Sequence, residues 1–232
     1  MTVLYLDPYF LGDPLFLGGF ARDLAARPPG APLVVVHGSG EAGERAVEAT
    51  GVEAVAAGGV WHVPTDAARA AVERATRELN RSIVHELNES NVAAVRVLGV
   101  DRGLLRADGA APRAGTAGWL AMLARQGAVP VVGTLAHRDG RVVEVDAAAS
   151  AAALAQGLGA AAVTVLLKGR APTVVNADGP VARLAPDALG TVRGIPDADA
   201  LRRIVRAGTS VRMTTLSTVR AGDSEMGTHV TA

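Results

Sequence analysis

The stretch that decides the fold is Leu33-Val-Val-Val-His-Gly-Ser-Gly-Glu41. Its uncharged, β-branched first half predicts a buried parallel strand, and Gly38 begins a turn. Glycines at 38 and 40 let a ligand approach the backbone closely, and the N–H groups that open the next helix, 41–48, favour an anion. The stretch therefore predicts a phosphate or carboxylate cradle, although an ordinary strand–turn–helix connection has the same pattern.

Composition narrows the class of protein. The 232 residues suffice for one large α/β domain, and the net charge of zero argues against a nucleic-acid or anionic membrane partner. No apolar run approaches the roughly 18 residues of a membrane span. Asp7 and Asp13 interrupt any leader-like apolar start, so we expect a cytoplasmic protein. The chain has no cysteine, and none of its histidine spacings fits a metal site, so no metal ligand is predicted.

Strand and helix patterns alternate along the chain. Strands are expected at 2–6, from Leu33 onward, and at 92–98, 129–132, 162–167 and 210–216, with an edge strand after Gly227-Thr228. Helices are expected at 16–26, 41–48, 65–89, 116–126, 146–157 and 196–207. Segment 10–19 is expected to form a loop, 52–63 a loop or short hairpin, and 104–112, 138–141 and 172–183 hairpins. This order predicts a three-layer αβα sandwich with a mostly parallel sheet, in a single domain 1–232.

Ligands of such sheets bind beyond the carboxyl ends of the strands. Residues 37–40 and Lys168-Gly169-Arg170 follow predicted strands in this way, and Lys168 is the only lysine of the chain. Lys168 and Arg170 can reach a phosphate or an anionic substrate there, or they are solvated turn residues. His37 is either a satisfied histidine at a strand end or a donor to a ligand.

Two further pairs are candidates for a substrate site. Glu144 and Asp146 alternate on a predicted strand and would face the same side, close enough for a shared cation or a raised pKa, unless they form a charged strand edge. Trp61 and His62 form either a specificity loop or plain packing. The sequence shows no recognisable catalytic triad with a nucleophile, a histidine and a carboxylate.

Several stretches in order resemble the amino-acid kinase family, and within it the acetylglutamate kinases and the related aminoadipate kinases. The matching stretches are Pro32-Leu-Val-Val-Val-His-Gly-Ser-Gly40, Leu79-Asn80, Gly127-Ala-Val-Pro-Val-Val132, Gly140-Arg-Val-Val-Glu-Val-Asp-Ala147, Ala153-Leu-Ala-Gln-Gly-Leu-Gly-Ala160 and Gly227-Thr228. The resemblance implies the amino-acid kinase fold, with an acceptor-side half at about 1–150 and a nucleotide-side half at about 151–232. It also implies ATP and Mg²⁺, a small carboxylic-acid substrate such as an N-acylated amino acid, and a homodimer formed through the long helix.

The resemblance also implies roles for residues. Gly38, Ser39 and Gly40 would meet the transferring phosphate and the acceptor carboxylate, with Gly38 and Gly40 in the catalytic centre. Substrate would be bound by His37, Ser39, Trp61, His62, Glu144 and Asp146. Lys168 would neutralise charge in catalysis, and the nucleotide would be bound by Lys168, Gly169 and Arg170.

The chain departs from the family pattern at its charged positions. The first strand ends in Tyr5-Leu6-Asp7-Pro8, without the family's lysine and paired glycines. Glu144 stands at the family's acceptor asparagine, and Ala148 stands at its organising aspartate. Three functions therefore follow from the sequence: a divergent carboxylate kinase, a pseudokinase that binds a ligand or regulates a partner, or an enzyme that reuses the acceptor pocket with Glu144, Asp146 or His62 as acid or base.

Overall fold

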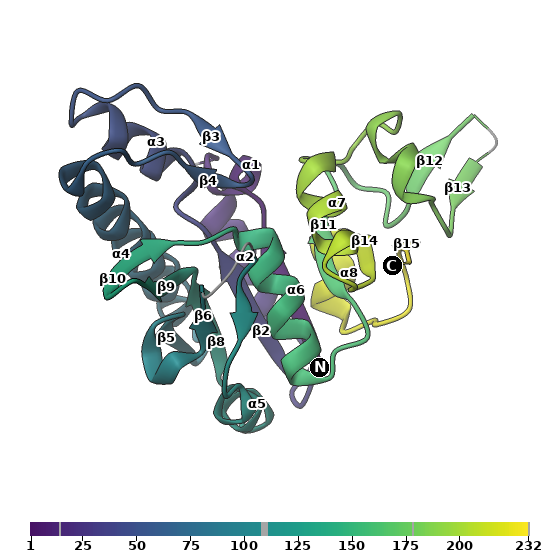
Figure 1. Ribbon diagram of the computed structural model, residues 1–232. Coiled ribbons are helices and arrows are strands. Elements are labelled where there is room, and N and C mark those ends of the chain that lie inside the picture. Colours follow the sequence, from purple (N-terminus) through teal and green to yellow (C-terminus); the bar gives the residue numbers. More distant parts are fainter. Residues whose placement is uncertain (14, 108–110, 178, 232) are drawn as a thin grey trace.

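A seven-stranded sheet forms the centre of the molecule in the computed structural model, which describes residues 1–13, 15–107, 111–177 and 179–231. All neighbouring strands of this sheet are parallel except β14 and β15, which pair antiparallel at one edge. In spatial order the strands are β15 (Thr228–Val230), β14 (Val211–Thr214), β11 (Val163–Leu166), β1 (Thr2–Leu6), β2 (Leu33–His37), β8 (Val129–Gly133) and β5 (Ala94–Leu98). The predicted mostly parallel sheet is confirmed (Figure 1).

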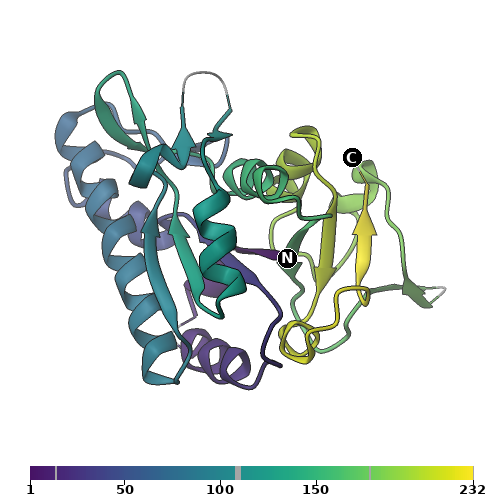
Figure 2. The same ribbon diagram turned by 90° about the horizontal axis from the view of Figure 1, so that it is seen from below.

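Helices cover both faces of this sheet (Figures 1 and 2). One face carries α2 (Phe16–Ala25), α4 (Asp66–Glu89) and α8 (Leu216–Ala221), whereas the other carries α5 (Gly118–Arg125), α6 (Ala147–Leu158) and α7 (Ala198–Arg206). Alternate side chains of β1 explain this division, because Leu4 and Leu6 enter one core and Val3 and Tyr5 enter the other. The three-layer αβα sandwich is therefore confirmed.

Smaller elements lie around the sheet. A four-stranded sheet contains β10 (Arg141–Glu144), β9 (Leu135–Arg138), β6 (Leu105–Arg106) and β7 (Arg113–Ala114). Two hairpins pair β3 (Ala56–Ala57) with β4 (Val60–Trp61), and β12 (Val174–Asn176) with β13 (Gly179–Val181). The remaining elements are α1 (Pro8–Leu11), α3 (Gly40–Glu48) and the 3₁₀ turns η1 (Asp101–Gly103) and η2 (Pro186–Gly190).

The turn residues follow the sequence prediction where the structure describes them. Asp139 and Gly140 both have positive φ, 51° and 74°, as a type I′ hairpin between β9 and β10 requires. The predicted hairpins at 104–112 and 172–183 include residues outside the described part of the chain, although the strands described on either side do pair antiparallel.

Two predicted boundaries were wrong. Phe10 and Leu11, expected in a loop, belong to helix α1, because the Asp7 carboxylate accepts a hydrogen bond from the N–H of Tyr9 at 2.8 Å and Pro8 occupies the first helical position. The strand expected at 210–216 ends at Thr214, and Leu216 already begins α8.

Within the described residues, no helix combines the length and apolar character needed to cross a membrane.

Candidate functional site

The carboxyl ends of β1 and β2 open into a cavity of about 260 Å³, here called the strand-end cavity. The β3–β4 hairpin, α1, the start of α3, the end of β10 and one side of α7 complete its walls. Its polar and aromatic lining includes Tyr5, Ser39, Glu44, Trp61, Glu144 and Arg203. The position agrees with the rule that α/β sheets bind ligands beyond their strand ends.

Glu144 occupies the predicted anion cradle. The backbone N–H of Ser39 donates a hydrogen bond to Oε1 of Glu144 at 2.5 Å, and the Ser39 hydroxyl donates to Oε2 at 2.9 Å. Gly38 permits this approach, because a Cβ there would lie 3.2 Å from Oε1 of Glu144 and 3.3 Å from the Cβ of Ala147. The cradle therefore already holds a carboxylate, and that carboxylate belongs to the chain itself.

Burial alters the acidity of Glu144. Removal from water raises its pKa from 4.5 to about 7, and the two hydrogen bonds from Ser39 oppose this rise by stabilising the ionised form. The nearby negative charge of Asp146 adds a smaller upward contribution. At neutral pH this carboxyl group is therefore divided between its acid and its carboxylate form.

Arg203 brings the C-terminal part of the chain to the cavity. Its Nε lies 3.0 Å from Oδ2 of Asp146, and its Nη2 lies 3.8 Å from Oδ2 of Asp197. Burial raises the pKa of Asp146, and the positive charge of Arg203 offsets part of that rise. Gly59 of the β3–β4 hairpin lies directly against this ion pair, because a Cβ there would come within 2.5 Å of Asp146 Oδ1.

Asp7 and Lys168 lie at the neighbouring ends of β1 and β11. Asp7 is 2% exposed, and burial raises its pKa to about 6, which Lys168 and Arg203 oppose through their positive charge. Its Oδ2 has no hydrogen-bond partner among the described residues. Lys168 is exposed, and its Nζ lies 3.7 Å from the ring centroid of Tyr9 on α1. Lys168 therefore stacks on an aromatic ring and does not line the strand-end cavity.

His37 lies behind the cavity and is fully buried. Its Nδ1 is 2.8 Å from the carbonyl oxygen of Gly38, and its Nε2 is 2.9 Å from Nδ2 of Asn80. A neutral ring that donates from Nδ1 and accepts at Nε2 satisfies both contacts, and burial lowers the pKa of His37 to about 4. Of the two interpretations of His37, this arrangement supports a histidine at a strand end whose hydrogen bonds are made within the chain.

The structure brings together part of the predicted site. Gly38, Ser39, Gly40, Trp61 and Glu144 all line the strand-end cavity. His37 and His62 do not line it. His62 is exposed, and its backbone N–H donates a hydrogen bond to the carbonyl oxygen of Val55. Lys168 lines a separate recess of about 310 Å³ together with Arg193, and Gly169 and Arg170 are exposed beside it.

The expected shared face and shared cation of Glu144 and Asp146 were wrong, although the pKa of each carboxyl group is raised as expected. Glu144 ends β10, but Asp146 is the N-cap of α6 and accepts a hydrogen bond from the N–H of Ala148. The chain turns between them, so Glu144 contacts Ser39 and Asp146 contacts Arg203. The two carboxylates hold different partners rather than one cation.

Sequence reasoning missed four residues of the site: Tyr5, Glu44, Asp197 and Arg203. Tyr5 lies in an apolar strand. The alternation of side chains along a strand indicates which face is buried, but it does not show that this face borders a polar cavity. Asp197 had a legible signal, since it caps α7 by accepting from the N–H groups of Asp199 and Ala200. Arg203 shares its helix with Arg202 and Arg206, and only the direction in which α7 packs distinguishes it.

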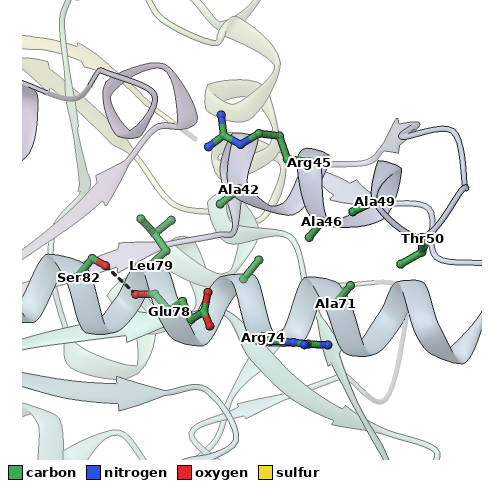
Figure 3. Close-up of a pocket in the computed structure, with 11 residues that line it drawn as sticks. Ala42, Arg45, Ala46, Ala49, Thr50, Ala71, Arg74, Glu78, Leu79 and Ser82 are labelled. Atoms are coloured by element: carbon green, nitrogen blue, oxygen red, sulfur yellow. Dashed lines mark hydrogen bonds between the residues drawn. The ribbon is translucent and has the colours of Figure 1, made fainter.

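A larger hollow of about 680 Å³ lies on the outer surface between α3 and α4. Figure 3 shows the small side chains of Ala42, Ala46, Ala49 and Ala71 between these helices, and the charged side chains of Arg45, Arg74 and Glu78 also line the hollow. Its lining contains none of the residues that follow the strand ends. Its position therefore does not suggest the reaction site of an α/β sheet.

Comparison with known proteins places this geometry in a family. The model of the amino acid kinase family matches residues 12–186. The acetylglutamate kinase of Deinococcus radiodurans is 38% identical over 152 residues, which cover 62% of this chain and 59% of that enzyme. The acetylglutamate kinase of Chloroflexus aggregans is 31% identical, with 97% of this chain and 96% of that enzyme covered.

Solved structures agree on the fold. An isopentenyl phosphate kinase superposes with a TM-score of 0.67 at 14% identity, with both chains fully covered. The N-acetylglutamate synthase of Neisseria gonorrhoeae gives the same TM-score at 17% identity, with 59% of that chain covered. The matched segment also spans only 59% and 64% of the Deinococcus radiodurans and Solibacter usitatus enzymes. With its sheet order, its cradle and the family model in agreement, this chain belongs to the amino acid kinase family.

Proposed function

We propose that this chain is a ligand-binding member of the amino acid kinase family that does not transfer a phosphoryl group by the family's route. The observation that carries the proposal is the bidentate contact of Glu144 with Ser39. The backbone donor that would stabilise the charge of a transferring phosphate already donates to a carboxylate. In its ionised form this carboxylate also repels a phosphate that approaches the same donor.

The cations of the site support the same proposal. Phosphoryl transfer needs positive charge at the transferring group. Lys168 stacks on Tyr9 away from the cavity, and the charge of Arg203 is balanced by Asp146 and Asp197. These residues do not fit the γ-phosphate of a Mg·ATP complex at the cradle.

A divergent carboxylate kinase is the second candidate. Two observations favour it: the relatives named acetylglutamate kinase, and the guanidinium of Arg203 on the cavity wall with Gly38 and Gly40. In that case a ligand would displace Glu144 from Ser39, and Arg203 would exchange Asp197 for the phosphate. The substrate would be a small carboxylic acid, with ATP and Mg²⁺ as in the family.

One experiment separates the two candidates. The purified protein is incubated with Mg·ATP and N-acetyl-L-glutamate, and ADP release is followed, with the Deinococcus radiodurans enzyme as positive control. We expect no ADP above background. Turnover that Arg203→Ala or Lys168→Ala abolishes, and that the exposed Arg206→Ala on the same helix preserves, would overturn the proposal. Calorimetric titration with a non-hydrolysable ATP analogue, with and without Mg²⁺, then shows whether a nucleotide site persists.

A further inference from the structure

The strand-end cavity has an acidic character that an anionic ligand does not match. Four carboxylate side chains line it: Glu41, Glu44, Glu144 and Asp197. Arg203 is the cation on its wall, and two carboxylates already contact that guanidinium. Glu41 pairs with Arg45 at 3.5 Å, but Glu44 has no ion pair among the described residues. Glu44 and the ionised form of Glu144 are therefore the carboxylates of this lining that have no ion-pair partner among the described residues.

The side chain of Tyr5 provides a second and independent observation. Tyr5 lines the cavity and is 3% exposed, yet its phenol makes no hydrogen bond with any described residue. Because Tyr5 lines the cavity, its hydroxyl is available to hydrogen-bond a molecule bound there. Burial is the largest cause of the raised pKa of Tyr5; the negative charges of Asp7, Asp197 and Asp146 add to it and Arg203 opposes it, so the phenol lies near these charged groups.

The shape and the aromatic wall complete the description of the ligand. The cavity holds about 260 Å³, which is roughly the volume of nine water molecules in the liquid. Trp61 lines it together with Glu44 and Glu144, and an indole next to carboxylates favours a cation over an anion. A molecule of the size of an amino acid fits this volume.

We propose that the strand-end cavity binds a small aliphatic ammonium compound, with its charged amino group among Glu144, Glu44 and Trp61 and a second polar group at the hydroxyl of Tyr5. The inference rests on the proposed function only in placing the ligand in this cavity. An ammonium group donates hydrogen bonds to each of these oxygens, whereas a carboxylate would meet acceptors of its own charge. Glu144, at the family's acceptor position, thereby selects the opposite ligand charge.

Three compounds of equal chain length test the charge preference. Calorimetric titrations at pH 7.5 and low salt use 1,5-diaminopentane, 1,5-pentanediol and glutarate, which differ chiefly in charge. We expect the diamine to bind at least about tenfold more tightly than the diol, and glutarate to show no binding. Raising the salt concentration should weaken the diamine, because the attraction is electrostatic.

Variants place the binding in this cavity. Glu144→Gln and Glu44→Gln should each weaken the diamine by about tenfold, and Glu48→Gln, exposed on the same α3 helix, should leave it unchanged. Circular dichroism confirms that each variant is folded, and Glu44→Gln decides the outcome if Glu144→Gln is not. Preference for glutarate, absence of diamine binding at 10-fold excess over a 1 mM protein solution, or equal binding by Glu44→Gln and wild type would overturn the inference.

The experiments distinguish a failure of this inference from a failure of the proposed function. Glutarate binding without ADP release would overturn the ammonium ligand and leave the absence of phosphoryl transfer intact. ADP release from Mg·ATP with diamine-selective binding would overturn the proposed function and keep the ligand class.

Discussion

Glu144 and Ser39 lie 105 positions apart in sequence, and their contact joins the end of β10 to the start of α3 across the strand-end cavity. Ser39 contributes both its backbone N–H and its hydroxyl, so both carboxylate oxygens of Glu144 have a donor. A glutamate at this position thus converts an open anion cradle into a closed one. The loop 38–40 is held by the same side chain that fills it.

The first prediction concerns the pH dependence of stability. Glu144 has a pKa of about 7 in the folded protein and an ordinary value of 4.5. A raised pKa means that the folded state binds the proton more tightly, so this contribution to stability is complete below pH 4.5 and is lost as the pH rises through 7. We expect a loss on the order of 2 kcal/mol over this range, allowing for solvent at the cavity wall.

Urea unfolding of wild type and Glu144→Gln between pH 4.5 and 8 measures this loss. The variant should gain stability relative to wild type as the pH rises. Asp7, with a raised pKa, and His37, with a lowered pKa, titrate in both proteins and cancel in the comparison. A difference between the two proteins that stays constant across this range would contradict the assignment.

The second prediction concerns the buried pair behind the cavity. Nδ2 of Asn80 lies 2.9 Å from both Nε2 of His37 and the carbonyl oxygen of Val131, and all of these groups are buried. Asn80→Ala should cost about 2 kcal/mol, because it leaves a buried imidazole nitrogen and a carbonyl without a donor. Ser82→Ala, on the exposed side of the same helix, should change stability by less than about 0.5 kcal/mol. Equal effects of the two substitutions in urea unfolding would count against this role.

Much of the scaffold could be predicted from the sequence because its signals are local. Val34, Val35 and Val36 form an uncharged β-branched run, and they are fully buried in β2. Thr65 was a legible N-cap, and its hydroxyl accepts from the N–H of Ala68 at 3.1 Å. The spacing of hydrophobic residues, the residues of a turn and the cap of a helix each depend on a few neighbouring positions, so they can be recognised in the sequence.

The site resisted prediction because its partners are distant in sequence. Nothing near Glu144 indicates that its carboxylate meets Ser39, and nothing near Arg203 indicates Asp146. Lys168 carried the strongest local signal as the sole lysine at a strand end, but Tyr9 holds its ammonium group on the neighbouring helix. Which cation reaches a cavity is decided by the packing of helices, and local sequence does not specify that packing.

The third prediction concerns Lys168. Its ammonium group lies over the ring of Tyr9, in a partly solvated contact. A double-mutant cycle of Lys168→Met and Tyr9→Leu should show a coupling of about 0.5–1 kcal/mol in unfolding free energy. Because Lys168 does not line the strand-end cavity, Lys168→Met should leave diamine affinity within about twofold of wild type. Zero coupling would indicate that the contact is not maintained in solution.

The last prediction uses two adjacent glycines of the β3–β4 hairpin. Both have positive φ, 59° at Gly58 and 81° at Gly59, so alanine at either position carries backbone strain of about 1 kcal/mol. At Gly58 a Cβ meets nothing within 4 Å, whereas at Gly59 it would lie 2.5 Å from Asp146 Oδ1 and 2.9 Å from Arg203 Nη2. Gly59→Ala should therefore destabilise the protein by about 1–3 kcal/mol more than Gly58→Ala, since the hairpin or the ion pair must move.

The same comparison tests whether the hairpin closes the cavity. Displacement of the hairpin moves Val60 and Trp61, which line the cavity, so Gly59→Ala should also weaken diamine binding by about tenfold in calorimetric titration. Gly58→Ala has the same backbone strain without the steric conflict and should bind as wild type does. If the two alanine variants lose the same affinity and stability, backbone strain alone explains both, and the contact of Gly59 with the Asp146–Arg203 pair has no part in forming the site.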